Sequence, residues 1–351
     1  MQRRAVKGYG VLQVEPTDYC NLRCSMCPPH AQSWQQIHGI PKGFLSVDVW
    51  KNIVASLARE KVEFDHMIFQ WLGDPLFHPH IDEIIAIAQD TLHPYVGYFR
   101  MDSNMILLTK ARVHKMLQSV NSGAPMLFVA SIDAHSREIY TTVKGYDYLD
   151  VVRSNLRYLL YYRKKYNIAL NLQVQFVVQK GNAHETIEFQ RYWLDCLRCY
   201  GGEMWHDEIM FKRLSVEGGG EGQSVADTIY QQHVLDRGIT HTTIDNVQIH
   251  IWENKPWQHD DAGQTMQRSA CPGLWSTPVI RHDGRLIMCC ADLQGKLELG
   301  NLAEHSFLDL WLSPKAKQKR QEHLQGKFTG VCHSCGGINW YDLPPHYRQM
   351  V

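Results

Sequence analysis

Short apolar runs alternate with amphipathic segments along residues 9–215. Six apolar runs predict buried strands, at residues 9–17, 64–73, 95–103, 126–133, 169–178 and 207–215. Apolar side chains that recur every three or four positions predict helices between them, at residues 46–60, 81–89, 110–120 and 149–166. Asn182 and Glu185 form a capping-box-like pair, which predicts that a further helix begins there. Such repeated βα units imply a parallel sheet, either barrel-like or doubly wound.

The repeating pattern ends at a glycine-rich stretch, residues 216–224. Residues 225–265 are polar and weakly patterned, and from Cys271 onward short strands and turns alternate with cysteines. We therefore predict a core βα domain at 1–224, a linker segment at 225–265 and a small metal-held domain at 266–351. In a parallel α/β sheet the chemistry is expected at the carboxyl ends of the strands.

Charge and composition exclude several classes of function. Lys plus Arg and Asp plus Glu both number 36, so the chain lacks the clustered basic excess of a nucleic-acid-binding protein. The first ten residues hold no apolar signal-peptide region, and no uninterrupted apolar run approaches the length of a membrane span. We therefore expect a cytoplasmic protein that binds neither nucleic acid nor membrane. In that compartment its ten cysteines are expected to be ligands or catalytic groups rather than a disulfide framework.

Three of these cysteines, Cys20, Cys24 and Cys27, lie within eight residues directly after the first predicted strand, with C-x(3)-C-x(2)-C spacing. Three thiolates can hold three irons of a [4Fe–4S] cluster and leave the fourth iron open to a chelating small molecule. The spacing also permits a zinc site that His30 or a distant ligand completes.

This loop resembles the hallmark of the radical S-adenosylmethionine (SAM) superfamily, and later stretches match that family in order. WLGDPLFHP (71–79) resembles its Gly-Gly-Glu-Pro segment, with Asp74 in place of the usual Glu and Leu72 in place of the first Gly. DSNMILLT (102–109), VASIDAHSREIYTTVKG (129–145) and VVQKGNAHE (177–185) resemble the ends of the family's third, fourth and fifth strands. The resemblance implies SAM contacts near Met26, Gly73, Asp74, Asn104, Ser131, Asp133 and Lys144.

The family resemblance implies a partial (β/α)6 TIM-like barrel. SAM would chelate the open iron, and one electron from the cluster would release a 5′-deoxyadenosyl radical that abstracts hydrogen from the substrate. Because Asp is shorter than Glu, backbone carbonyls of the 71–79 segment are expected to make most of the contact with the SAM amino group. Lys144 is expected to contact SAM or, alternatively, to lie exposed in a loop.

A second set of cysteines follows, with Cys289 placed by a C-x(12)-G-x(4)-C pattern through Gly284. The predicted ligands are Cys271, Cys289, Cys332 and Cys335, with Cys290 as the alternative to Cys289. By spacing alone a four-cysteine zinc site fits as well. The stretch resembles the SPASM/Twitch extension, which implies a small α+β domain with one auxiliary [4Fe–4S] cluster that transfers electrons.

The resemblance to Twitch enzymes such as the butirosin-pathway aminocyclitol dehydrogenase type favours a radical SAM oxidoreductase. It would oxidise or epimerise a polar small molecule such as a sugar or aminocyclitol, with an external electron donor such as flavodoxin or ferredoxin. Modification of a ribosomally made peptide is the alternative. Strand-end residues predicted to line a polar pocket are Arg100, Gln175, Gln179, Lys212 and Arg213. Cys196 and Cys199 are expected to be structural, or to be spare thiols for an epimerase.

Overall fold

The computed structural model describes residues 8–27, 42–119, 123–202, 204–215, 220–252 and 269–333, together with residues 335, 337, 343, 347, 350 and 351. His30 therefore lies outside the described residues. The predicted strands form the centre of one sheet, as β1 (Val11–Val14), β2 (His66–Phe69), β3 (Phe99–Ser103), β4 (Met126–Ser131), β5 (Leu170–Val178) and β6 (Glu208–Arg213). These strands pair in parallel in chain order, which confirms the parallel sheet.

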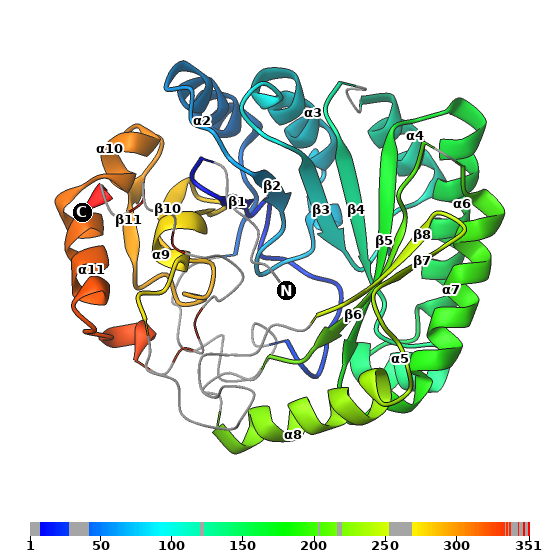
Figure 1. Ribbon diagram of the computed structural model, residues 1–351. Coiled ribbons are helices and arrows are strands. Elements are labelled where there is room, and N and C mark those ends of the chain that lie inside the picture. The colour runs from blue at the N-terminus through cyan, green and yellow to red at the C-terminus, as the bar shows by residue number, and fades with distance from the viewer. Residues whose placement is uncertain are drawn as a thin grey trace.

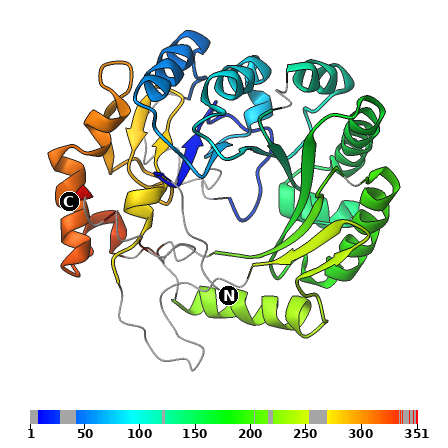
Figure 2. The ribbon, with the colours of Figure 1, turned by 45° about the horizontal axis from the view of Figure 1, so that its top comes forward.

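Helices cover the outer face of this sheet, which curves around the centre of the molecule (Figures 1 and 2). They are α2 (Val47–Arg59), α3 (Ile81–Leu92), α4 (Lys110–Ser119), α5 (Arg137–Lys144), α6 (Leu149–Tyr166) and α7 (Thr186–Tyr200). Within the described residues the sheet has two free edges, at β7 and β11, so the arrangement is an open, partial barrel. This confirms the predicted fold class.

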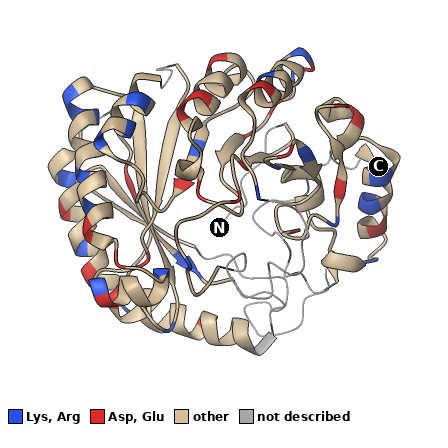
Figure 3. Cartoon of the chain, turned by 180° about the vertical axis from the view of Figure 1, so that it is seen from behind, with Lys and Arg blue, Asp and Glu red and all other residues tan. Residues whose placement is uncertain are grey.

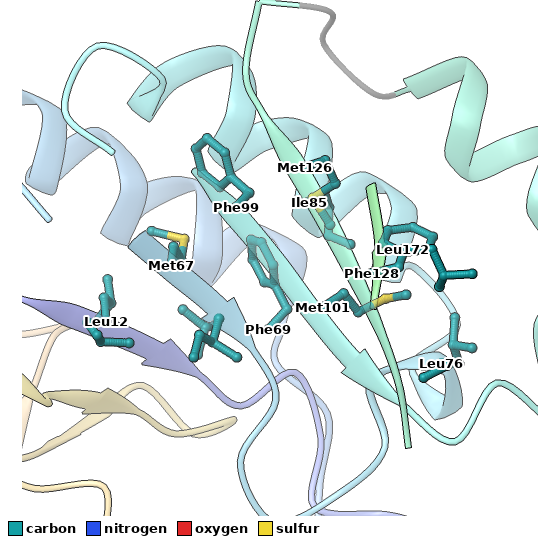
Figure 4. Packing of buried hydrophobic residues seen from close by; sticks show 14 of the residues in the cluster. Leu12, Met67, Phe69, Leu76, Ile85, Phe99, Met101, Met126, Phe128 and Leu172 are labelled. Atoms are coloured by element: carbon teal, nitrogen blue, oxygen red, sulfur yellow. The ribbon is translucent and has the colours of Figure 1, made fainter. Parts of the chain in front are cut away.

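The hydrophobic core lies between the sheet and these helices. Large side chains such as Phe69, Phe99, Met101 and Phe128 point to one side of the strands and pack near Ile85 of α3 (Figure 4). Since side chains alternate along a strand, the residues between them face the concave side. The core therefore occupies the outer layer and leaves the inner face of the sheet to other side chains.

The sheet continues beyond β6 through residues that the sequence placed in the linker. Helix α8 (Gly220–Tyr230) and a π-helical turn η4 (Gln231–Leu235) lead to β7 (Thr242–Ile244) and β8 (Val247–Ile251). Strand β8 pairs in parallel with β6, and β7 pairs antiparallel with β8. The predicted linker 225–265 thus contributes two strands to the sheet, and the division of the chain into three domains stays a prediction.

The other edge of the sheet is built by the C-terminal region. Strand β9 (Val279–Ile280) pairs in parallel with β1, and β10 (Arg285–Ile287) pairs antiparallel with β9 and with β11 (Glu298–Asn301). Gly284 has φ +83° in the turn between β9 and β10, which confirms the predicted hairpin. The remaining elements are α9 (Gly273–Ser276), α10 (Phe307–Trp311), α11 (Pro314–Leu324) and the short helices η2 (Pro75–Phe77), η3 (Ala183–Glu185) and η5 (Gly330–Cys332).

The predicted helix start at Asn182 is confirmed, because η3 begins at Ala183 and continues into α7, but Asn182 and Glu185 do not form a capping box. The Asn182 amide oxygen accepts from the Gln179 backbone N–H at 2.8 Å and does not cap the helix. The Glu185 carboxylate accepts from the backbone N–H groups of His135, at 2.6 Å, and Ser136. Both side chains satisfy backbone groups of the loops at the ends of β4 and β5, because those loops need partners more than the helix start does.

Positively and negatively charged residues both occur along the outer helices (Figure 3). Over the described residues, no helix is both long and apolar enough to cross a membrane.

Candidate functional site

The loop after β1 carries Cys20, Cys24 and Cys27 to the carboxyl edge of the sheet. The Cys27 N–H donates to the Cys24 carbonyl at 3.1 Å, and the three thiols interact electrostatically. Burial raises the pKa of all three thiols, to about 12 for Cys20 and Cys27; Asp74 adds to this at Cys20, Asp133 at Cys24, and the other two thiols at Cys27. Buried thiolates need a bound cation to be stable, so this donor set fits an iron–sulfur cluster.

Backbone contacts hold the thiol loop against the C-terminus of α5. The Arg23 N–H donates to the Lys144 carbonyl at 3.2 Å, and the Ser25 N–H donates to the Val143 carbonyl at 3.0 Å. Gly145 follows with φ +85°, and a Cβ there would lie 3.0 Å from the Arg23 carbonyl oxygen. The end of α5 therefore fixes where the loop can lie.

The segment after β2 approaches the same loop closely. A Cβ on Gly73 would overlap the Thr17 carbonyl oxygen and lie 2.6 Å from that of Tyr19, so only glycine fits. The Asp74 N–H donates to the Tyr19 carbonyl at 2.9 Å. Its buried carboxylate accepts from Ser103 Oγ at 3.0 Å and from the Asn104 N–H at 2.8 Å. Asp74 thus joins β2 to β3, and its own role toward SAM stays a prediction.

Asn104 reaches back to the thiol loop. Its Nδ2 donates to Asn21 Oδ1 at 2.7 Å and lies 4.0 Å from Cys20 Sγ. Met26 lies near the end of β5, where its sulfur accepts from Gln179 Nε2 at 3.7 Å. The predicted residues after β1, β3 and β5 therefore converge on one edge of the sheet.

Asp133 and Lys144 form a buried ion pair beside the thiol loop. Burial lowers the pKa of Lys144, but Asp133 and the nearby Cys24 outweigh it, so the pKa is raised. The alternative of an exposed loop lysine is therefore wrong, because Lys144 is 2 % exposed. Asp133 also accepts from the Val177 N–H at 2.6 Å. Ser131, at the end of β4, pairs with Gln175 in the parallel ladder.

Polar side chains line the concave face of the sheet. The sequence predicted only some of them as pocket residues. Arg100 binds Asp102 through two hydrogen bonds of 2.6 and 2.5 Å. Gln173 Nε2 donates to Glu208, while Gln173 Oε1 has no partner. The Oε1 atoms of Gln13 and Gln175 are likewise buried and unpartnered within the described residues. Period-two alternation in LNLQVQFVV and EIMFKR is the sequence signal that could have revealed this face.

Of the other predicted pocket residues, Lys212 lies at the end of β6. Arg213, its neighbour in sequence, instead forms an ion pair with Asp227 of α8 at 2.8 Å. Adjacent strand residues face opposite sides, so Arg213 does not line the same face as Lys212. Cys196 and Cys199 lie on α7 in the outer layer.

The second set of cysteines gathers beside the β9–β10 hairpin. The Cys290 thiol interacts electrostatically with Cys271 and Cys335. A hydrogen bond with Cys290 raises the pKa of Cys289, whose sulfur also accepts from Thr277 Oγ1 at 3.8 Å. Cys332 is buried in η5. The described residues hold no group of three or more Cys, His, Asp or Glu side chains arranged around a single metal ion, so the fit to a cluster rests on the donor chemistry.

Two contacts link the two thiol sets. Trp71 Nε1 donates to the Cys290 carbonyl at 2.9 Å, and its ring packs against Val279 and Ile287. Glu15, fully buried at the end of β1, lies 3.7 Å from Arg281 of the hairpin. Burial raises the pKa of Glu15 to about 7. The thiol loop after β1 and the C-terminal hairpin therefore adjoin.

Comparison with known proteins decides the family. Residues 14–168 match the radical SAM superfamily, and residues 271–336 match SPASM, described as an iron–sulfur cluster-binding domain. The chain carries a radical SAM domain and a SPASM domain. Its first domain match covers the thiol loop and the ends of β1 to β4, and the second covers the C-terminal cysteines. A SAM-binding [4Fe–4S] cluster and additional clusters in the SPASM domain follow from this membership.

Solved structures share the radical SAM fold. SuiB of Streptococcus suis bound to S-adenosylmethionine aligns with TM-score 0.59 and 15% identity, over 94% of this chain and 73% of that one. BtrN in complex with AdoMet and 2-DOIA gives 0.51 and 13%, over 96% of both chains. The anSMEcpe structure with AdoMet and the Cp18Cys peptide gives 0.59 and 15%, over 92% of this chain and 84% of that one.

Two curated relatives align at higher sequence identity but over a smaller share of this chain. The GTP 3',8-cyclase of Stenotrophomonas maltophilia is 28% identical over 153 residues, 43% of this chain and 42% of that relative. The chain thus spans less than half the length of this relative. The tungsten-containing aldehyde ferredoxin oxidoreductase cofactor-modifying protein of Pyrococcus furiosus is 23% identical over 320 residues, 87% of this chain and 81% of that relative.

Proposed function

We propose that the protein cleaves SAM reductively and uses the resulting 5′-deoxyadenosyl radical to oxidise a polar small molecule, such as a carbohydrate or aminocyclitol. Cys20, Cys24 and Cys27 would hold the SAM-binding cluster. Cys271, Cys289, Cys332 and Cys335 would hold one auxiliary cluster that accepts the second electron. Flavodoxin or ferredoxin would supply the reducing electron.

The unpartnered amide oxygens on the concave face carry the substrate assignment. Gln13, Gln173 and Gln175 each bury a side-chain oxygen with no partner in the described residues. Buried acceptors without a donor are costly, so a ligand with several hydroxyl or amino groups would satisfy them. Gln173 and Gln175 lie two residues apart on β5 and face the same side of the sheet, so neighbouring hydroxyl or amino groups of a sugar or aminocyclitol would donate to both, which supports a small polar substrate.

The experiment is an anaerobic assay of the reconstituted protein. Wild-type protein should bind about eight irons and convert SAM to 5′-deoxyadenosine when dithionite is added. Incubation with myo-inositol, glucosamine or streptamine should yield a product two mass units lighter, in proportion to the 5′-deoxyadenosine formed. Cys20→Ala should abolish 5′-deoxyadenosine formation because the SAM-binding cluster loses a ligand.

Three results would contradict the proposal. A Cys20→Ala protein that still forms 5′-deoxyadenosine would overturn the assignment of the SAM-binding cluster. A wild-type protein that cleaves SAM, loses no hydrogen to any of the polyols and alters a supplied peptide would favour peptide modification instead. A product of unchanged mass but inverted configuration would favour epimerisation, with a thiol as hydrogen donor.

A further inference from the structure

Lys212 lies on the concave face, close to the carboxyl end of β6. The β5–β6 register pairs Gln173 with Glu208, Gln175 with Met210 and Val177 with Lys212. Paired residues of neighbouring parallel strands face the same side of the sheet, and so do residues two apart along a strand. Lys212 is therefore one layer beyond the unpartnered Gln175, toward the edge that carries the thiol loop.

The Lys212 amine has no hydrogen-bond or ion-pair partner among the described residues. Its Nζ lies 5.4 Å from the centroid of the Trp252 ring. Charged groups interact with it from elements beyond β5, namely Arg100 and Asp102 of β3 and Asp133 after β4. Both carboxylates are already engaged, Asp102 by Arg100 and Asp133 by Lys144. Lys212 is only partly exposed, and a lysine on the inner face of a sheet without a carboxylate partner in the described residues is unusual for a structural residue.

The position also connects Lys212 to the SAM site. Asp133, which interacts with Lys212, is the ion-pair partner of Lys144, and Lys144 interacts in turn with Cys24. A substrate held by the amides of the concave face would thus lie between Gln175 and the thiol loop, with the Lys212 amine beside it.

These surroundings favour the neutral amine. Burial lowers the pKa of Lys212, the Arg100 guanidinium lowers it further, and Asp102 and Asp133 oppose this only in part, so the pKa falls to about 8. An amine with such a pKa exchanges protons readily near neutral pH. Lys144 differs, because it is ion-paired and its pKa is raised.

We propose that Lys212 is the base that accepts the hydroxyl proton of the substrate during its oxidation. This rests on the proposed function. The substrate carbon loses its hydrogen atom to the 5′-deoxyadenosyl radical, which becomes 5′-deoxyadenosine. The O–H bond breaks with its proton on Lys212 Nζ, one electron leaves to the auxiliary iron–sulfur cluster as oxidant, and the C–O bond becomes a ketone.

The first test needs no substrate. The reconstituted holoprotein is treated with formaldehyde and dimethylamine–borane across pH 6–11, and methylation of Lys212 is measured by peptide mass spectrometry. Only a neutral amine reacts, so the rate should reach half its plateau near pH 8. Nα-acetyl-lysine amide is the reference, with a midpoint near pH ~10.4. A Lys212 midpoint at the reference value, or no methylation at any pH, overturns the inference.

The second test compares variants on a polyol that the wild-type protein oxidises. Lys212→Met and Lys212→Arg should both lower ketone formation about 10²–10⁴-fold, because neither side chain accepts a proton, while 5′-deoxyadenosine still forms. Lys110→Met is the matched control, since Lys110 also lies over an aromatic ring, 5.1 Å from Tyr158, but on the exposed start of α4. It should behave as wild type.

The outcomes separate the inference from the function on which it rests. Lys212→Arg with wild-type ketone formation, beside an inactive Lys212→Met, means that a fixed positive charge suffices, so Lys212 binds an anionic group and is not the base. A wild-type protein that cleaves SAM but oxidises none of the polyols overturns the proposed function, and the methylation midpoint is unaffected by that failure.

Discussion

Single residues determine how closely the thiol loop lies against the strand ends. Gly73 allows the carbonyl groups of Thr17 and Tyr19 to come within contact of its backbone, and the Asp74 carboxylate then joins that segment to Ser103 and Asn104. These contacts require that Gly73 has no side chain and that the Asp74 side chain is short. The sequence departs from the family's usual Gly-Gly-Glu-Pro here, and Asp74 fits the short distance to β3.

Gly73→Ala should therefore displace the thiol loop. The added Cβ would lie 2.6 Å from the Tyr19 carbonyl oxygen, so backbone on one side must move, at a cost of about 1–3 kcal/mol in unfolding free energy. We expect iron loss and at least ~10-fold slower 5′-deoxyadenosine formation. Gly181→Ala is the control, because a Cβ there has nothing within 4 Å. Equal rates and stabilities for the two variants would show that the close approach at Gly73 is unimportant.

The adjacent pair Cys289 and Cys290 poses a separate question of ligand identity. Spacing from Gly284 predicts Cys289, whereas the Cys290 thiol is the one that interacts electrostatically with Cys271 and Cys335. We expect Cys289→Ala to reduce the iron content from about eight to about four per chain and Cys290→Ala to leave it unchanged. The reverse result, by iron and sulfide analysis of the anaerobically reconstituted variants, would identify Cys290 as the ligand.

At the scale of elements, Trp71 connects the end of β2 with the hairpin β9–β10. Its indole N–H binds the Cys290 carbonyl, and its ring packs on one residue from each strand of the hairpin. Two residues later, Gly73 contacts the thiol loop. One short segment thus touches both thiol sets and fixes their relative position.

Trp71→Phe keeps most of the ring packing and removes the hydrogen bond to the Cys290 carbonyl. We expect a loss of about 1 kcal/mol in unfolding free energy and a measurable change in the EPR spectrum and midpoint potential of the auxiliary cluster. Trp205→Phe is the matched control: Trp205 is equally buried, at 7 % exposed, and its N–H binds the Ile168 carbonyl at 2.9 Å, away from the cysteines. If both variants change stability equally and neither changes the spectrum, Trp71 has only a structural role.

Periodicity predicted the elements well because each buries one face locally. In α2, for example, Trp50, Ile53 and Leu57 are buried as their spacing predicts. What it could not predict are contacts between distant segments. Glu185 satisfies backbone groups of the loop after β4 instead of capping its own helix. The short alternating run VQIHI in the predicted linker becomes β8 only because β6 offers a free edge. Lys144 becomes buried only because Asp133 pairs with it.

At the scale of the whole molecule, the SPASM region completes the sheet of the barrel. Strand β9 pairs with β1, so residues more than 250 positions apart share one ladder, in which Gln13 aligns with Val279. The Glu15 and Arg281 contact and the Trp71 cluster lie along the same boundary. The thiol loop begins directly after β1, so the SPASM hairpin supports the strand from which the SAM-binding loop departs.

A chain that ends at residue 252 should therefore be destabilised beyond the loss of its auxiliary cluster. It would uncover the β1 edge and the Trp71 ring, which we expect to cost more than about 3 kcal/mol, or roughly 6–12 °C in the midpoint of thermal unfolding. The control is the full-length quadruple variant Cys271→Ala, Cys289→Ala, Cys332→Ala and Cys335→Ala, which loses the predicted ligands but keeps β9 and β10. Circular dichroism melts and size-exclusion chromatography would compare both with wild type. If the short chain is monomeric and unfolds at the same temperature as the quadruple variant, the barrel folds without its neighbour and the predicted boundary marks an independent domain. If the short chain melts at a lower temperature than the quadruple variant, or aggregates, the barrel requires the pairing of β9 with β1 and not the bound metal.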